Sequence, residues 1–248
     1  MRKFGLIGYP LGHSFSAKYF RDKFERESIR GCLYSNYEIA SLSSLTNIIQ
    51  DPELEGLNVT IPYKQQVIPF LHKKDRVVEE TGACNCIRIE KGVLTGYNTD
   101  VTGFEKSLAE KLTATDNRAL ILGTGGSSKA VAWVLQKRGI AFVFVSRKPS
   151  GSGNQTTYEN LDAEIMASHP LIINCTPLGM SPETATCPPI PYDYLSPLHY
   201  LFDLVYNPAK TLFLEKGEAA GTRIKNGSDM LAIQAEAGWA IWNDLPGR

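Results

Sequence analysis

The sequence predicts an α/β protein made of two successive domains. Short apolar runs with strand character alternate with longer runs in which apolar residues recur at helical spacing, and this alternation continues along all 248 residues. Strands that alternate with helices form parallel sheets covered by helices. A chain of this length has room for two ordinary domains, and the polar, charge-balanced stretch 113–118 reads as a boundary between two such series.

In the first series, strands and helices precede a hairpin. Two strand-like runs within residues 84–98 flank Lys91-Gly92, which indicates a tight hairpin turn. A helical pattern follows at 101–112. The other strands expected here are residues 3–8, 32–39 and 56–61, and the other helices are 15–28 and 41–50.

The second series repeats the alternation. An apolar strand at 119–123 leads into a helix at 129–139, and the chain ends in an apolar-rich helix at 229–244. Residues 148–170 are few for a full crossover between parallel strands, so we expect a short helix there. The remaining strands expected are 141–147, 171–176, 200–206 and 222–227.

Composition argues against several classes of protein. Lys+Arg and Asp+Glu both number 26, so the net charge is zero, which disfavours nucleic-acid binding through overall positive charge. No apolar run reaches about 18 residues and the N-terminus lacks a signal-peptide pattern, so we expect a cytoplasmic protein without a membrane anchor. The five cysteines are irregularly spaced and no histidine lies near the C-x-C pair, which favours reduced thiols over disulfides or a metal site.

A glycine-rich turn predicts a dinucleotide site in the second series. Gly123, Gly125 and Gly126 lie between the strand at 119–123 and a helix. Glycines there let backbone N–H groups approach a pyrophosphate at the helix N-terminus, where the helix dipole favours negative charge. An ordinary β–α turn is the alternative interpretation.

The end of the next strand indicates which dinucleotide binds. An NAD site usually carries Asp or Glu there to bond the ribose 2′-hydroxyl, whereas this chain has Ser146, Arg147 and Lys148. The arginine fork matches a 2′-phosphate, so we favour NADP over NAD. The alternative is that Arg147 and Lys148 are a solvated strand end.

Polar side chains also follow three apolar strands of the first series, at the edge where open α/β sheets bind ligands. Together they suit a small polyhydroxylated molecule with a carboxylate, and a lysine and an aspartate on one substrate oxygen can relay a proton. Ser14 and Asp100 have an alternative role as helix N-caps, and Lys64 as a surface charge. The three clusters are Ser14 and Ser16; Asn58, Thr60 and Lys64; and Asn98, Thr99 and Asp100.

These motifs, in this order and spacing, resemble the shikimate dehydrogenases, which reduce 3-dehydroshikimate with NADPH. The resemblance covers nearly the whole chain. It rests on HSFS (13–16), GLNVTIPYK (56–64), TGACN (81–85), GYNTDVTG (96–103), GTGGSSKA (123–130), SRK (146–148), NCTPLGM (174–180), DLVYNPAKTLFL (203–214) and NGSDMLAIQA (226–235).

The resemblance implies a role for each matched residue. Lys64 and Asp100 become the catalytic pair at the oxygen that turns into a carbonyl, and Asn58 orders the loop around them. Ser14, Ser16 and Tyr206 hold the substrate carboxylate, and Thr60, Asn85 and Gln234 bond the ring oxygens. Gly123, Gly125, Gly126 and Ala130 meet the pyrophosphate, Arg147 and Lys148 the 2′-phosphate, and Thr176, Met180, Gly227 and Met230 the nicotinamide side.

The resemblance also implies the domain plan and the partners. Residues 1–101, completed by the terminal helix 228–248, form an α/β substrate-binding domain, and residues 102–227 form a Rossmann-type NADP-binding domain, with the active site in the cleft between them. The partner expected is shikimate or 3-dehydroshikimate, and the chain is expected to be a monomer or homodimer.

Three other functions stay open. A quinate/shikimate dehydrogenase using NAD would keep the fold. A non-catalytic ligand sensor on the same scaffold would have no need of a Lys64–Asp100 proton relay. A folate-type methylene dehydrogenase would not be expected to carry Ser14, Ser16 and Gln234.

Overall fold

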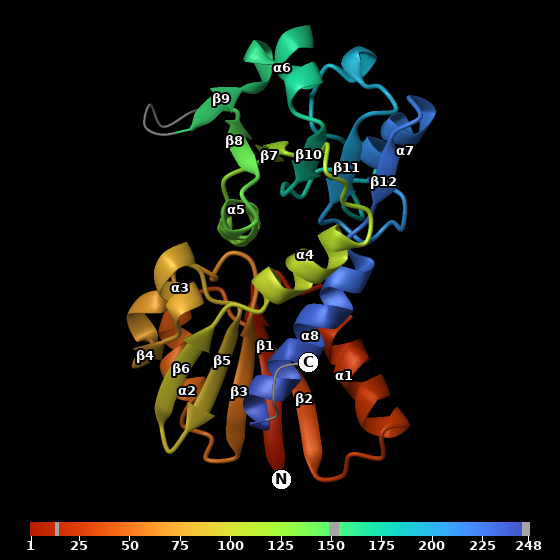
Figure 1. Ribbon diagram of the computed structural model, residues 1–248. Helices are drawn as coiled ribbons and strands as arrows, with labels where there is room; N and C mark the ends of the chain where they lie inside the picture. The colour runs from red at the N-terminus through yellow and green to blue at the C-terminus, as the bar shows by residue number, and fades with distance from the viewer. Residues whose placement is uncertain (13–14, 149–153, 245–248) are drawn as a thin grey trace. The chain divides into compact units, whose positions relative to one another are not determined.

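The computed structural model describes residues 1–12, 15–148 and 154–244. The chain separates into two compact units, Met1–Thr102 with Ala232–Arg248 and Gly103–Leu231. It passes from one unit to the other within helix α4 (Asp100–Ala109) and again within helix α8 (Ser228–Trp242) (Figure 1). The prediction of an α/β protein whose terminal helix returns to the first domain is therefore confirmed. No helix in the described part of the chain is long and apolar enough to cross a membrane.

The first unit is built on a six-stranded sheet of order β2-β1-β3-β5-β6-β4. The turn residues Lys91 and Gly92 both have positive φ, 49° and 78°, which is the backbone of a type I′ hairpin turn. The two hairpin strands are consequently antiparallel, so this sheet is mixed rather than purely parallel. The strands are β1 (Arg2–Gly8), β2 (Cys32–Glu38), β3 (Leu54–Val59), β4 (Lys73–Lys74), β5 (Cys86–Glu90) and β6 (Val93–Tyr97).

Helices cover both faces of this sheet, because side chains alternate between faces along a strand. Phe4 of β1 packs with Phe20 of α1 (Phe15–Arg26) and with Trp239 and Trp242 of α8. Ile7 of β1 belongs to the opposite cluster, which includes side chains of α2 (Leu45–Ile48) and α3 (Arg76–Thr81). The terminal helix therefore completes the core of the first unit.

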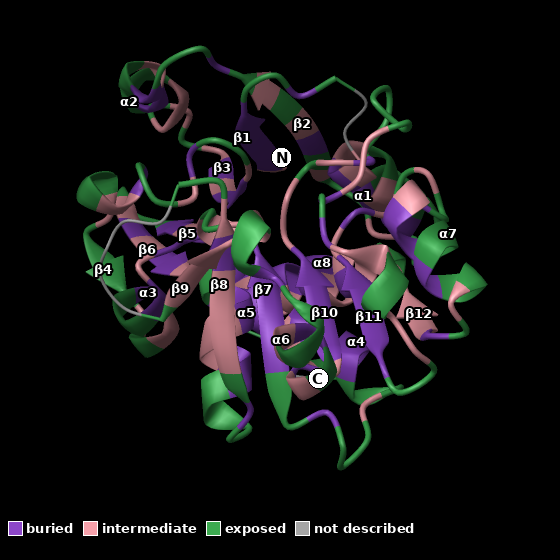
Figure 2. Cartoon of the chain, turned by 90° about the horizontal axis from the view of Figure 1, so that it is seen from above, coloured by how far each residue is buried: buried purple, intermediate pink, exposed green. Residues whose placement is uncertain are grey.

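The second unit has a six-stranded, all-parallel sheet of order β12-β11-β10-β7-β8-β9. In chain order this is the doubly wound Rossmann arrangement, which starts at the centre and grows outwards in both directions. The central strands β7, β10 and β11 are mostly buried, whereas β8 is partly exposed (Figure 2). The strands are β7 (Arg118–Leu122), β8 (Ala141–Ser146), β9 (Gln155–Thr157), β10 (Leu171–Asn174), β11 (Tyr200–Asp203) and β12 (Arg223–Lys225).

Two helices of the second unit were expected from the sequence and a third was not. α5 (Gly126–Lys137) follows the glycine turn, and α6 (Ala163–Ser168) has only six residues, as expected for the short segment before β10. α7 (Leu212–Ala219) was not predicted, and its N-cap is Thr211. Residues 113–118 lie inside this unit rather than at its boundary. Their polar character instead reflects buried Asp116, which pairs with Arg223 at 2.7 Å.

Candidate functional site

A lysine–aspartate pair lies at the end of two elements of the first unit. Lys64 follows β3, and Asp100 is the first residue of α4. The Lys64 ammonium is 2.7 Å from Asp100 Oδ2, and the two side chains are only 15% and 8% exposed. Lys64 is therefore not a solvated surface charge. Charges so shielded interact more strongly than they would in water.

Asn85 connects this pair to the rest of the site. Its Nδ2 donates to Asp100 Oδ1 at 2.9 Å and to Thr99 Oγ1 at 3.0 Å. Its Oδ1 accepts from the Thr99 backbone N–H at 2.7 Å. Since one carboxylate oxygen of Asp100 faces Lys64 and the other faces Asn85, the orientation of Asp100 is fixed from both sides.

Gln234 reaches the same cluster from α8. Its Oε1 lies 3.4 Å from both Asn85 Nδ2 and Thr99 Oγ1. Asn85, Thr99 and Gln234 are all buried. The structure thus brings together Lys64, Asn85, Asp100 and Gln234, although they are distant in sequence. Thr99, which the sequence analysis placed in one polar cluster with Asp100, also belongs to this group.

A buried hydrogen-bond chain extends from Asn85 towards the start of α1. The Asn58 Nδ2 donates to the Asn85 carbonyl oxygen at 3.4 Å, and the Tyr34 hydroxyl donates to Asn58 Oδ1 at 2.7 Å. Ser16, the second residue of α1, hydrogen-bonds the same hydroxyl, while burial raises the pKa of Tyr34 well above its usual value. Tyr34 sits on β2, and its role could not be read from sequence because it depends on strand register.

The other expected substrate residues are placed as follows. Thr60 follows β3, half-buried, with its backbone N–H on the Ile7 carbonyl at 3.0 Å. Ser14 lies outside the described residues. Tyr206 belongs to the second unit, where it is half-buried and burial raises the pKa of its phenol.

The glycine turn of the second unit leaves an open helix N-terminus. Gly125 is the N-cap of α5, and no side chain caps the helix there. A Cβ built on Gly125 would meet nothing within 4 Å. Gly123 has φ +102°, and a Cβ there would lie 3.1 Å from Thr176 Cγ2. The α5 N-terminus can therefore receive a phosphate group, while Ala130 is buried on the same helix.

The end of β8 carries two cations and an unpaired hydroxyl. Arg147 and Lys148 follow the strand and are exposed. The Ser146 hydroxyl is buried and has no hydrogen-bond partner within the described residues. Burial raises the pKa of nearby Tyr158 to about 12, and the Arg147 guanidinium acts in the opposite direction. A buried hydroxyl that is unpaired within the described residues and two exposed cations fit a polar, phosphorylated ligand.

The residues expected beside the nicotinamide lie on two segments of the second unit. Thr176 and Met180 are on the loop after β10, half-buried and 42% exposed respectively. Gly227 precedes α8, and a Cβ there would lie 2.4 Å from the Leu204 carbonyl oxygen. Met230 is buried in the first turn of α8. Only glycine fits at position 227.

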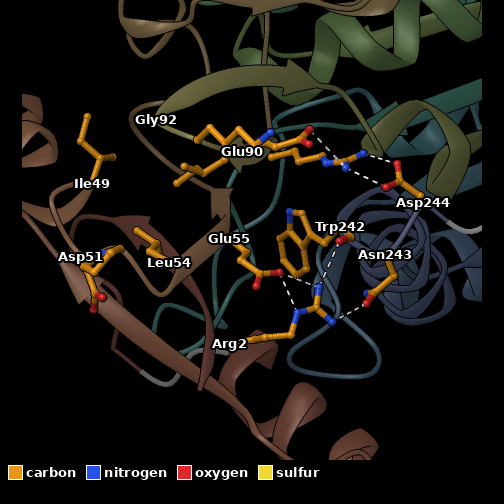
Figure 3. Close-up of a pocket in the computed structure, with 14 residues that line it drawn as sticks. Arg2, Ile49, Asp51, Leu54, Glu55, Glu90, Gly92, Trp242, Asn243 and Asp244 are labelled. Carbon is orange, nitrogen blue, oxygen red and sulfur yellow. Dashed lines mark hydrogen bonds and ion pairs between the residues drawn. The ribbon is translucent and has the colours of Figure 1, made fainter.

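A cavity of about 780 Å³ in the first unit is separate from these residues (Figure 3). It is lined by the start of β1 and β3, the hairpin and the end of α8, so it lies at the opposite end of the strands from Thr60 and Lys64. Five of its charged side chains pair with one another. Arg2 binds Glu55 at 2.7 Å, and Arg88 binds Asp244 and Glu90. The cavity therefore offers no free charge to a ligand through these side chains.

Two of the thiols, those of Cys84 and Cys86, are buried. All five cysteines are free. Burial raises the pKa of Cys84 to about 12, so this residue stays a thiol at neutral pH and lacks nucleophilic character.

Comparisons with known proteins agree on one family. A family model described as the shikimate dehydrogenase substrate binding domain matches residues 6–87. A shikimate dehydrogenase (NADP(+)) from Clostridium beijerinckii is 36% identical over 255 residues, covering 98% of this chain and 93% of the relative. The chain is also similar to the Thermus thermophilus shikimate 5-dehydrogenase solved with NADP(H) and shikimate, with a TM-score of 0.88, 26% identity and coverage of 100% and 95% of the two chains.

A structure with a different substrate name is also similar. The Corynebacterium glutamicum quinate dehydrogenase in complex with NAD has a TM-score of 0.87 and 25% identity, covering 98% of this chain and 94% of that chain. The fold alone therefore does not distinguish shikimate from quinate as the substrate.

Proposed function

Because the chain belongs to the shikimate dehydrogenase family and has the NADP-dependent shikimate dehydrogenase activity of that family, we propose that Lys64 and Asp100 move the proton of the reaction. The observation that carries this proposal is the 2.7 Å contact between the two shielded side chains. A pair of opposite charge, fixed in place and reachable by a small ligand, is suited to general acid–base work.

The reaction interconverts a ring hydroxyl and a ring carbonyl. When bound, NADP accepts or supplies the hydride at the ring carbon. In the reducing direction Lys64 donates a proton to the oxygen that becomes the hydroxyl, and the carboxylate of Asp100 holds the ammonium in place. In the oxidising direction the pair takes that proton up. Lys64 also stabilises negative charge that develops on the oxygen, an interaction stronger in the transition state than in the ground state.

The neighbouring polar groups orient the substrate in this proposal. Thr60, Asn85 and Gln234 bond the ring oxygens, since amide and hydroxyl groups both donate and accept. Ser14 and Ser16 hold the carboxylate, helped by Tyr206. The half-buried position of Thr60 and the buried cluster around Asn85 support these roles.

The cofactor residues in this proposal belong to the second unit. The open N-terminus of α5 and Ala130 receive the pyrophosphate, and Ser146, Arg147 and Lys148 meet the 2′-phosphorylated ribose. Thr176, Met180, Gly227 and Met230 form the nicotinamide side. Support comes from the unobstructed Gly125 and the unpaired Ser146 hydroxyl. We assign residues 1–101 with 228–248 to the substrate domain and residues 102–227 to the cofactor domain.

Strictness for NADP over NAD and for shikimate over quinate is also part of the proposal. The end of β8 has two cations at Arg147 and Lys148, which favours a 2′-phosphate. Cytoplasmic location and a monomeric or homodimeric state remain predictions.

The test is a set of steady-state rates with shikimate and quinate, each with NADP and NAD. We expect kcat/KM for shikimate with NADP to exceed each other combination by at least about 10-fold, which corresponds to one charge-assisted contact of about 1.4 kcal/mol or more. The highest kcat/KM with quinate and NAD would contradict the assignment. Binding of shikimate without turnover would indicate a sensor.

A further inference from the structure

A fully buried carboxylate lies behind the residues assigned to the nicotinamide side. Asp203 is the last residue of β11 and is 0% exposed. Its Oδ1 accepts from Asn174 Nδ2 at 2.9 Å and from the Val205 backbone N–H at 3.0 Å, and its Oδ2 accepts from Thr211 Oγ1 at 2.5 Å. These partners are all neutral, and they belong to three different segments.

The first connection reaches Thr176. Asn174 turns its Nδ2 towards Asp203, so its Oδ1 points the other way and accepts from Thr176 N at 2.9 Å and Thr176 Oγ1 at 2.6 Å. The Thr176 methyl group in turn packs against Gly123 of the glycine turn. One asparagine thus transmits the position of Asp203 to the loop after β10.

The second and third connections reach Met180 and Gly227. Thr211, which is also the N-cap of α7, packs against Gly179, where a Cβ would lie 3.2 Å from the Thr211 Cβ. Gly179 has φ +87° and precedes Met180. Val205, held by Asp203 through its N–H, accepts from the Gly227 N–H through its carbonyl at 3.3 Å.

We propose that Asp203 is a positioning residue for the nicotinamide end of the cofactor, fixing through Asn174, Thr211 and Val205 the loop that carries Thr176 and Met180 and the segment that carries Gly227. The inference rests on the proposed assignment of these three residues to the nicotinamide side. Asp203 touches neither substrate nor cofactor in this account. Its effect is on the placement of the groups that do.

Its electrostatics support orientation rather than stabilisation as the reason for a carboxylate here. Burial raises the pKa of Asp203 to about 6 from an ordinary value of 3.8. The folded chain therefore binds this proton more tightly than the unfolded chain. This tighter binding of the proton stabilises the folded chain. The stabilisation is complete below pH 3.8, the ordinary pKa, and is lost as the pH rises through about 6. At neutral pH the ionised carboxylate opposes folding. What Asp203 contributes is therefore the placement of its two acceptor oxygens, which hold Asn174, Val205 and Thr211.

The test compares Asp203→Ala with Asp203→Asn. The alanine variant leaves Asn174, Val205 and Thr211 without their acceptor, and we expect kcat for shikimate oxidation with NADP to fall about 100-fold, the effect of misplacing reacting groups by about 1 Å. The asparagine variant keeps an acceptor for Asn174 and Val205 and donates to Thr211 instead. It should retain at least about a third of the wild-type kcat, because each of the three partners keeps one hydrogen bond to residue 203.

Binding of 2′,5′-ADP separates positioning from a general loss of structure. This probe has the adenosine and the 2′-phosphate but no nicotinamide, so its Kd should change less than about twofold in the alanine variant, as for an uncoupled site. A folded Asp203→Ala protein with near wild-type kcat would overturn the inference, and so would an equal loss of 2′,5′-ADP affinity.

A second variant covers failure of the alanine protein to fold. Asn174→Ala breaks the link to Thr176 and leaves Thr211 and Val205 on Asp203, and it should also lower kcat without changing the Kd of 2′,5′-ADP. Wild-type kcat in this variant would overturn the inference. Failure of the wild-type protein to bind 2′,5′-ADP would overturn the cofactor assignment itself, and the inference with it.

Discussion

Replacing Asn85 by aspartate changes the charge beside Asp100 with almost no change in shape. The Asn85 Nδ2 atom is 2.9 Å from Asp100 Oδ1, and Asn85 is buried. Two carboxylates at that 2.9 Å separation would repel by about 6 kcal/mol at an effective dielectric constant of about 20. The Lys64 ammonium, 2.7 Å from the other oxygen of Asp100, offsets part of this repulsion.

The repulsion that remains favours the state in which one of the two carboxyls is protonated. The two carboxyls of the variant then titrate as a pair, and they share one proton at low pH. In that state the protonated group donates to its neighbour as the Asn85 amide does. We therefore expect the ratio of variant to wild-type kcat/KM to be highest at low pH and to fall as the pH rises.

The assay is kcat/KM for shikimate oxidation with NADP from about pH 5 to about pH 9, spanning the expected titration of the pair. Gln65→Glu is the matched control, because Gln65 is exposed and follows Lys64 directly. This control adds the same charge in solvent and should leave the ratio nearly flat. A ratio for Asn85→Asp that does not vary with pH would refute the reasoning, since it would mean that Asn85 is not coupled to Asp100.

Three further changes probe the cofactor end, the substrate end and the fold. Arg147→Ala should raise KM for NADP by about 10-fold or more and leave the NAD reaction nearly unchanged, because only NADP has a 2′-phosphate; equal losses in both would assign Arg147 to the fold. The Ser14→Ala/Ser16→Ala double variant should weaken shikimate binding by roughly 1.5–3 kcal/mol per serine without affecting NADP, and a Kd measurement showing no change would remove them from the carboxylate site. Gly56→Ala places a Cβ 2.3 Å from Trp242 Nε1. Overpacking of about 1–3 kcal/mol should lower Tm by about 5 °C in a thermal unfolding scan, and an unchanged Tm would show that α8 packs elsewhere.

Much of the first site could be predicted because sheet geometry gathers strand ends. Lys64 and Asp100 are 36 positions apart, yet each follows an apolar strand or hairpin, and they meet at 2.7 Å. The glycine turn and the short segment before β10 were also visible as local patterns, because the backbone freedom of Gly123 and the length of a crossover are local properties.

What could not be predicted depends on register and on buried partners. Tyr34 reaches Asn58 only because β2 and β3 flank β1 in a particular register. α7 begins at Thr211, whose hydroxyl is held by Asp203 from another segment. By contrast, α3 was missed although its signals were present. Asp75 caps it by accepting from Val78 N at 2.8 Å, and Gly82 ends it with φ 61°.

The turnover number of Lys64→Ala tests the central claim most directly. If Lys64 moves the proton with Asp100, kcat for shikimate oxidation with NADP should fall by about 100-fold or more, with a smaller change in KM, because a positioned acid–base group acts mainly in the transition state. Lys74→Ala removes an exposed lysine of the same unit and should leave kcat unchanged. A folded Lys64→Ala protein with kcat close to that of the wild type would contradict the account.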